Sequence, residues 1–155
     1  MIDIFTKFAA AVPFETKKQY LVIKSGSGGS GRDFFQDITN DEFVSKYLPK
    51  YGIEFTYVDA SADAATWEAA IQPNTKMIYL ETPTNPGLDI INIKMVSGIA
   101  KKHNIILNVD NCFATPIGQT PIDLGADLVV HSATKWLDGQ GRVLGGAIVG
   151  RKDLI

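Results

Sequence analysis

Residues that could do chemistry gather directly after a short apolar run at 128–130. Ser132, Thr134 and Lys135 follow that run within a few positions. Two hydroxyls beside a lysine offer hydrogen-bond donors for a phosphate and an amine that can attack a carbonyl carbon. The glycines that follow, in residues 139–146, allow a sharp turn or a close approach of the backbone to a ligand. A polar turn carrying a solvated lysine is the alternative interpretation of the same residues.

Two further apolar runs also end in polar side chains. Residues 76–80 lead to Glu81 and the segment 82–86, which contains Asn85, and residues 105–109 lead to Asp110. In a parallel sheet the carboxyl ends of the strands share one edge, where ligands bind. These side chains are therefore predicted to meet the lysine segment in one crevice. For Asp110 the alternative is a helix cap or turn residue, and for Asn85 it is a turn former before a proline.

The elements that must position these residues follow from hydrophobic periodicity. Amphipathic spacing predicts helices, and short apolar or β-branched runs between them predict strands. We predict helices at 40–48, 62–71 and 93–103, and strands at 19–24, 53–58, 76–81, 105–110, 128–130 and 146–150. This alternation, with strands that are apolar on both faces, predicts an α/β fold: a mainly parallel sheet flanked by helices.

The stretch 25–31 consists only of glycine and serine. Such a composition is typical of a flexible linker, natural or engineered, and a phosphate-binding loop is the alternative. We therefore divide the chain into a poorly legible N-terminal segment (1–24), a Gly/Ser linker (25–31) and a partial α/β domain (32–155).

The run from His131 to Lys135, followed by Leu-Asp-Gly-Gln-Gly-Arg at 137–142, resembles the lysine segment of a known family. This is the Cys/Met-metabolism family of pyridoxal 5'-phosphate (PLP) enzymes, which includes cystathionine γ-synthases, γ-lyases and homoserine sulfhydrylases. The segment looks most like the O-succinylhomoserine sulfhydrylase branch. The resemblance implies the large PLP-binding domain of fold type I enzymes, and it covers roughly residues 41–155, well under half of a full-length member.

The resemblance also implies roles for individual residues. Lys135 would be the catalytic residue and would bind the cofactor aldehyde. Asp110 would face the pyridine nitrogen, Ser132 and Thr134 would bind the phosphate, and Asn85 would lie beside the ring's phenolic oxygen. A carboxylate opposite the pyridine nitrogen keeps that nitrogen protonated, which the cofactor needs to act as an electron sink.

The activity implied by the resemblance is γ-replacement on O-succinyl-L-homoserine by sulfide, which gives homocysteine for methionine biosynthesis. Cystathionine γ-synthase or γ-lyase chemistry, with another thiol or leaving group, is the alternative within the family. A truncated or engineered fragment that folds without catalysis is the alternative outside it. The expected partners are a small amino-acid substrate and sulfide or a thiol, with a homo-oligomer as the family's assembly.

Composition and charge limit the partners and the cellular location that we expect. A net charge of −2 with interspersed signs argues against nucleic-acid and membrane partners. No apolar run reaches the roughly 20 residues of a membrane span, and no signal peptide is expected from the pattern of the first residues. The single cysteine fits a reducing compartment, so a cytoplasmic location is expected.

Four conspicuous residues are not assigned to the site. Cys112 has no implied histidine partner and is expected to be a small buried side chain. His131 is expected to be packed, His103 to lie on a helix surface, and Trp136 to belong to the core. Two histidines and one cysteine at these positions do not have the spacing of a metal site.

Overall fold

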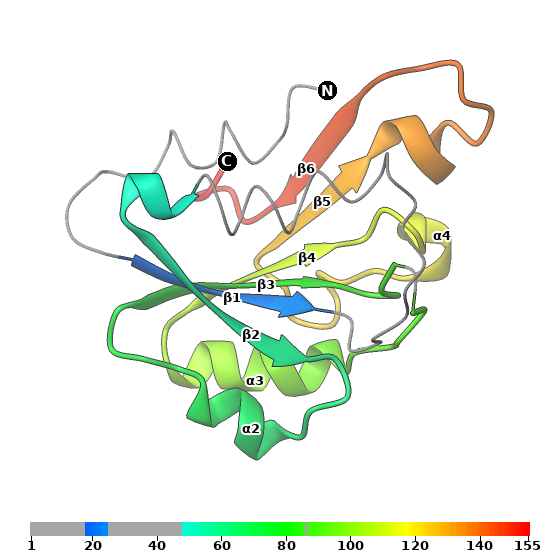
Figure 1. Ribbon diagram of the computed structural model, residues 1–155. Helices are drawn as coiled ribbons and strands as arrows, with labels where there is room; N and C mark the ends of the chain where they lie inside the picture. Colours follow the sequence, from blue (N-terminus) through cyan, green and yellow to red (C-terminus); the bar gives the residue numbers. More distant parts are fainter. Residues whose placement is uncertain (1–17, 25–47, 86) are drawn as a thin grey trace.

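A six-stranded sheet forms the centre of the computed structural model, which describes residues 18–24, 48–85 and 87–155 (Figure 1). The strand order is β2-β1-β3-β4-β5-β6. Strands β1 to β5 are parallel to their neighbours, and β6 is antiparallel to β5. The strands are β1 (Lys18–Lys24), β2 (Ile53–Asp59), β3 (Thr75–Glu81), β4 (Ile106–Asp110), β5 (Leu128–Ser132) and β6 (Gly146–Gly150).

Helices α2 (Ala64–Ala69) and α3 (Ile93–Lys102) cover one face of this sheet (Figure 1). Each begins at a side-chain cap, since the carboxylate of Asp63 accepts the Thr66 N–H and the amide oxygen of Asn92 accepts the Met95 N–H. Such caps satisfy backbone donors that the first helical turn leaves without partners. The shorter turns are η2 (Leu48–Tyr51), α4 (Thr115–Gly118) and the π-helical turn η3 (Ala133–Leu137).

The hydrophobic core lies between the sheet and these two helices. Alternate residues of β3, β4 and β5 point into it and meet Trp67 of α2, which is fully buried, and the inner side of α3. The strand and helix residues at its centre are Ile78, Leu80, Leu107, Val109, Val129, Val96 and Ile99. Because side chains alternate across a strand, the residues between them lie on the opposite face. Tyr79, Glu81, Asn108 and Asp110 are therefore on that opposite face.

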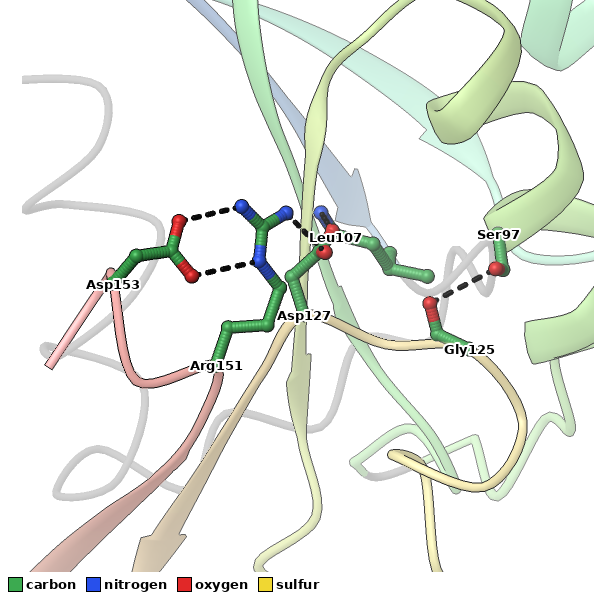
Figure 2. Close-up of polar contacts among 6 residues, drawn as sticks. All are labelled: Ser97, Leu107, Gly125, Asp127, Arg151 and Asp153. Carbon is green, nitrogen blue, oxygen red and sulfur yellow. Dashed lines mark hydrogen bonds and ion pairs between the residues drawn. The ribbon is translucent and has the colours of Figure 1, made fainter.

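The loop before β5 is held at the edge of the sheet away from the strands' carboxyl ends (Figure 2). The Ser97 hydroxyl of α3 donates to the Gly125 carbonyl at 2.9 Å. Gly125 has φ +102°, and a Cβ there would lie 2.2 Å from the Ser97 Oγ, so glycine is required. Asp127 accepts the Leu107 N–H and a guanidinium N–H of Arg151, each at 2.9 Å, and so joins β4, β5 and the chain after β6.

The α/β architecture and the mainly parallel sheet predicted from the sequence are confirmed. All six predicted strands are present, and the helices predicted at 62–71 and 93–103 correspond to α2 and α3. The predicted helix at 40–48 and the Gly/Ser stretch at 25–31 lie, apart from Leu48, outside the described residues. Across residues 18–24, 48–85 and 87–155, the helices are too short or too polar to cross a membrane.

Candidate functional site

The carboxyl ends of β3, β4 and β5 bring Glu81, Asp110 and Ser132 to one edge of the sheet, on the same face. The register pairs Glu81 with Asp110, and the Val130 carbonyl of β5 accepts the Asn111 N–H at 3.0 Å. Neighbouring strands lie about 4.8 Å apart, so these three strand ends are immediate neighbours. The backbone at these three strand ends is therefore adjacent, and that the side chains form one crevice with Lys135 stays a prediction.

Asp110 is held by a donor on each carboxylate oxygen. The Tyr79 hydroxyl donates to Oδ2 at 2.9 Å, and the Cys112 backbone N–H donates to Oδ1 at 3.0 Å. The second contact is local, so Asp110 is a turn residue as well as a candidate ligand. Tyr79 is buried, and burial followed by the charge of Asp110 raises the pKa of its phenol well above the ordinary value. The phenol therefore remains a hydrogen-bond donor at neutral pH.

Glu81, beside Asp110, carries a proton for part of the time at neutral pH. Burial, followed by the negative charge of Asp110, raises the pKa of Glu81 to about 7, although the Asn85 backbone N–H bonded to its carboxylate opposes this. A carboxyl group in a site with little water and a like charge nearby favours its neutral form.

Asn85 lies in a loop that closes on itself between β3 and α3. The Thr84 hydroxyl donates to the Asp89 carboxylate at 3.0 Å and accepts the Asp89 N–H at 2.9 Å, while the Thr82 hydroxyl accepts the Ile91 N–H at 2.9 Å. These contacts present Asn85 with an exposed side chain. Its backbone N–H reaches Glu81, so the loop is anchored to the strand end that carries the carboxyl pair.

A buried amide network joins two of the loops at this edge, and we did not predict it from the sequence. Asn111 is fully buried; its amide nitrogen donates to the Gln119 carbonyl at 2.9 Å, and its amide oxygen accepts from Gln119 Nε2 at 3.0 Å. Gln119 Nε2 also donates to the Thr82 carbonyl at 3.0 Å. The position of Asn111 next to Asp110 was the only available signal, because Gln119 is 37 residues from Thr82.

The lysine segment leaves β5 through η3. Ser132 is half-buried, and its N–H donates to Cys112 Sγ, which links the ends of β4 and β5. The Thr134 hydroxyl accepts the Gly145 N–H at 3.1 Å and lies 3.3 Å from the Gly145 carbonyl, so Thr134 closes the intervening loop. Lys135 is exposed, and its backbone departs from helical geometry inside the turn, with φ −88° and ψ −123°.

The prediction that Trp136 belongs to the core is wrong. Its side chain is 62% exposed and meets the half-exposed Phe113 edge-on, with ring centroids 6.3 Å apart and an interplanar angle of 76°. The physical reason is its position in η3, beyond the last residue of β5, where the chain has already left the sheet. An aromatic side chain in an apolar context was not sufficient to predict burial.

The other residues left unassigned behave largely as expected. His131 is buried, and burial lowers its pKa below the ordinary value despite the nearby charge of Asp110, so it is neutral at pH 7. Cys112 is half-buried, and burial followed by Asp110 raises the pKa of its thiol, which keeps it protonated and a poor nucleophile. His103 is exposed at the C-terminal cap of α3 and contacts the Glu68 carboxylate at 2.9 Å.

The described residues contain no group of three histidine, cysteine, aspartate or glutamate side chains that could hold a metal ion. The residue types at this edge are compatible with PLP, the cofactor that the family resemblance implies. A carboxylate held at both oxygens suits a cationic ring N–H, hydroxyls at Ser132 and Thr134 suit a phosphate, and the Lys135 amine suits an aldehyde.

The sequence of this chain matches a family of known proteins. Residues 32–155 match the family model described as Cys/Met metabolism PLP-dependent enzyme. An O-succinylhomoserine sulfhydrylase from Pseudomonas aeruginosa is 49% identical over 106 residues, which are 68% of this chain and 26% of that protein. A cystathionine β-lyase from Staphylococcus haemolyticus is 53% identical over 112 residues, which are 72% of this chain and 28% of that protein.

A solved structure agrees with the sequence comparison. The crystal structure of cystathionine γ-lyase from Lactobacillus plantarum, complexed with L-serine, superposes with a TM-score of 0.80 and 38% sequence identity. The alignment covers 97% of this chain and 36% of that one. The chain thus spans only about a quarter to a third of the length of these three proteins.

Proposed function

Because the chain belongs to the family of Cys/Met metabolism PLP-dependent enzymes, we propose that its strand-end edge is the cofactor site of an enzyme acting on an O-acylated homoserine. The observation that carries this proposal is the carboxylate of Asp110, held at both oxygens at the end of β4, one strand away from the lysine segment. PLP supplies an electron sink when bound, and that sink requires a protonated ring nitrogen.

Each residue of the edge has a role that suits its chemistry. Asp110 accepts the ring N–H, Ser132 and Thr134 bind the phosphate, Asn85 binds the ring's phenolic oxygen, and Lys135 binds the aldehyde. Thr134 is already bonded to Gly145 through its hydroxyl. A hydroxyl can donate and accept at the same time. Thr134 can therefore keep accepting the Gly145 N–H while its proton turns from the Gly145 carbonyl to a phosphate oxygen.

The reaction that we propose is γ-replacement: the bond between the γ-carbon of O-succinyl-L-homoserine and its ester oxygen breaks, and a carbon–sulfur bond to sulfide forms, releasing succinate and homocysteine. The sulfhydrylase among the relatives supports this choice. Other relatives are named as a cystathionine γ-lyase and a probable cystathionine γ-synthase, and they support the alternative of γ-synthase or γ-lyase chemistry with another thiol or leaving group.

Borohydride reduction in the presence of PLP, followed by peptide mapping, tests the cofactor site. We expect the pyridoxyl group on Lys135, and Lys135→Ala should remove the labelled peptide. Lys152, which is also exposed and lies beyond β6, offers a matched control: Lys152→Ala should leave the labelling unchanged. Labelling spread evenly over surface lysines would contradict the assignment.

A thiol assay then separates the reactions. The chain is incubated with O-succinyl-L-homoserine and either sulfide or cysteine, and the sulfur-containing product is identified by mass spectrometry. Homocysteine formed only with sulfide supports the sulfhydrylase reaction, and cystathionine formed with cysteine supports the alternative. If Lys135 is labelled but neither product forms, this stretch of chain folds and binds the cofactor without catalysing the reaction.

A further inference from the structure

Glu81 and Asp110 are cross-strand neighbours on the same face of the sheet. Adjacent parallel strands lie about 4.8 Å apart, so the two carboxyl groups project from the sheet side by side. Both residues are only partly accessible. Burial and a like charge nearby disfavour the ionisation of both carboxyl groups together. Something in the surroundings must determine which of the two remains charged.

Among the residues that the structure describes, the hydrogen bonds given to Asp110 outnumber the one given to Glu81. Asp110 receives the Tyr79 hydroxyl at 2.9 Å and the Cys112 N–H at 3.0 Å. Glu81 receives the backbone N–H of Asn85. A donor to an ionised carboxylate stabilises the charged form, and such charge-assisted bonds are stronger than neutral ones. The Tyr79 hydroxyl is a side-chain donor that a single substitution can remove.

Tyr79 comes from β3, the strand that also carries Glu81, and lies two residues before it. It therefore shares a face with Glu81 and reaches across to the end of β4. Its side chain is buried, and its hydroxyl donates to the Asp110 carboxylate at 2.9 Å. A phenylalanine would fill the same volume, so packing alone does not explain where the hydroxyl points.

We propose that Tyr79 is a positioning residue whose hydroxyl assigns the negative charge of the pair to Asp110 and leaves the proton on Glu81. Asp110 then presents an ionised, oriented carboxylate to the ring nitrogen of the cofactor. The charge assignment stands on the contacts of this chain alone, and only its use toward the ring nitrogen rests on the proposed function.

The other titratable groups in this neighbourhood are consistent with the assignment. Among the described residues, Tyr79, Glu81, Cys112 and His131 all interact electrostatically with Asp110. Burial holds Cys112 and Tyr79 protonated and His131 neutral at pH 7. None of these three groups therefore adds a charge beside the pair of carboxyl groups.

Carboxyl ¹³C NMR of the cofactor-free chain tests the charge assignment directly. With aspartate or glutamate labelled selectively, and the signals assigned by Asp110→Asn and Glu81→Gln, the parent at about pH 6 should show Glu81 mainly protonated. Tyr79→Phe should lower the protonated share of Glu81 at that pH, because Asp110 loses a donor that stabilises its charge. A protonated Asp110 in the parent, or unchanged signals in a folded Tyr79→Phe variant, would overturn the proposal.

Binding of PLP, and of an analogue with carbon in place of the ring nitrogen, tests the consequence for the cofactor. Tyr79→Phe should weaken PLP binding roughly tenfold, on the scale of one charge-assisted hydrogen bond, with little effect on the analogue. In an Asp110→Ala background, Tyr79→Phe should have no further effect on PLP. Equal losses for both ligands would instead indicate a purely structural role and contradict the proposed use of the charge.

Tyr51→Phe is the matched control, because Tyr51 is exposed and lies in η2, before β2, at the opposite edge of the sheet. It should change neither the NMR signals nor the affinities. A parent that does not bind PLP, or that binds both ligands equally, would refute the proposed function of Asp110. The NMR result would still decide the charge assignment.

Discussion

The Glu81 carboxyl group should make the stability of the fold depend on pH. Burial and the charge of Asp110 raise its pKa from 4.5 to about 7 in the folded chain. Folding therefore favours the protonated form. The contribution to stability is fully present below the unfolded pKa of 4.5 and is lost as the pH rises through about 7.

The size of the effect follows from the two pKa values. Between about pH 5 and about pH 8, linkage with folded and unfolded values of about 7 and 4.5 gives a loss of about 2.5 kcal/mol in the free energy of unfolding. Glu81→Gln keeps the shape of the protonated side chain and cannot ionise. The variant should therefore lose this part of the pH dependence and become the more stable protein, relative to the parent, at the higher pH.

Urea denaturation of the parent and of Glu81→Gln at a series of pH values measures this directly. The lowered pKa of His131 acts in the opposite direction, because it favours the folded state as the pH rises. His131 is present in both proteins, so the difference between their free energies of unfolding isolates the contribution of Glu81. Glu54→Gln, an exposed change on β2, is the matched control. Parallel pH profiles for the parent and Glu81→Gln would refute the burial and charge argument.

Four further substitutions test the packing that positions the site. Trp67→Ala should lower the free energy of unfolding by about 3–5 kcal/mol, measured by urea denaturation, because the side chain is fully buried. Gly125→Ala should cost at least about 1 kcal/mol in the same assay, because the residue has φ +102° and its new methyl would meet Ser97. Asp127→Ala should lower the free energy of unfolding by about 1–3 kcal/mol, because it leaves the Leu107 N–H of β4 without its acceptor. Arg151→Gln, which removes the exposed partner of Asp127, should lower it far less.

The alternation of strands and helices was predictable from the sequence because burial imposes period two on strands and period 3.6 on helices. The apolar runs before Glu81, Asp110 and Ser132 correspond to β3, β4 and β5, and the parallel arrangement predicted the edge at which they end. The identities of the candidate site residues came from this rule and from the lysine segment, both of which are local in sequence. Their roles toward the cofactor stay predictions.

Tertiary structure alone decided which side chains touch. Tyr79 and Asp110 are 31 residues apart, and only the register of β3 against β4 brings the phenol to the carboxylate. Asn111 and Gln119 join loops in the same way, and Trp136 is exposed because the chain leaves the sheet before it. Periodicity records which residues are buried. The choice of hydrogen-bond partners, and with it which carboxyl group keeps its charge, depends on distances that arise only when separate strands pack side by side.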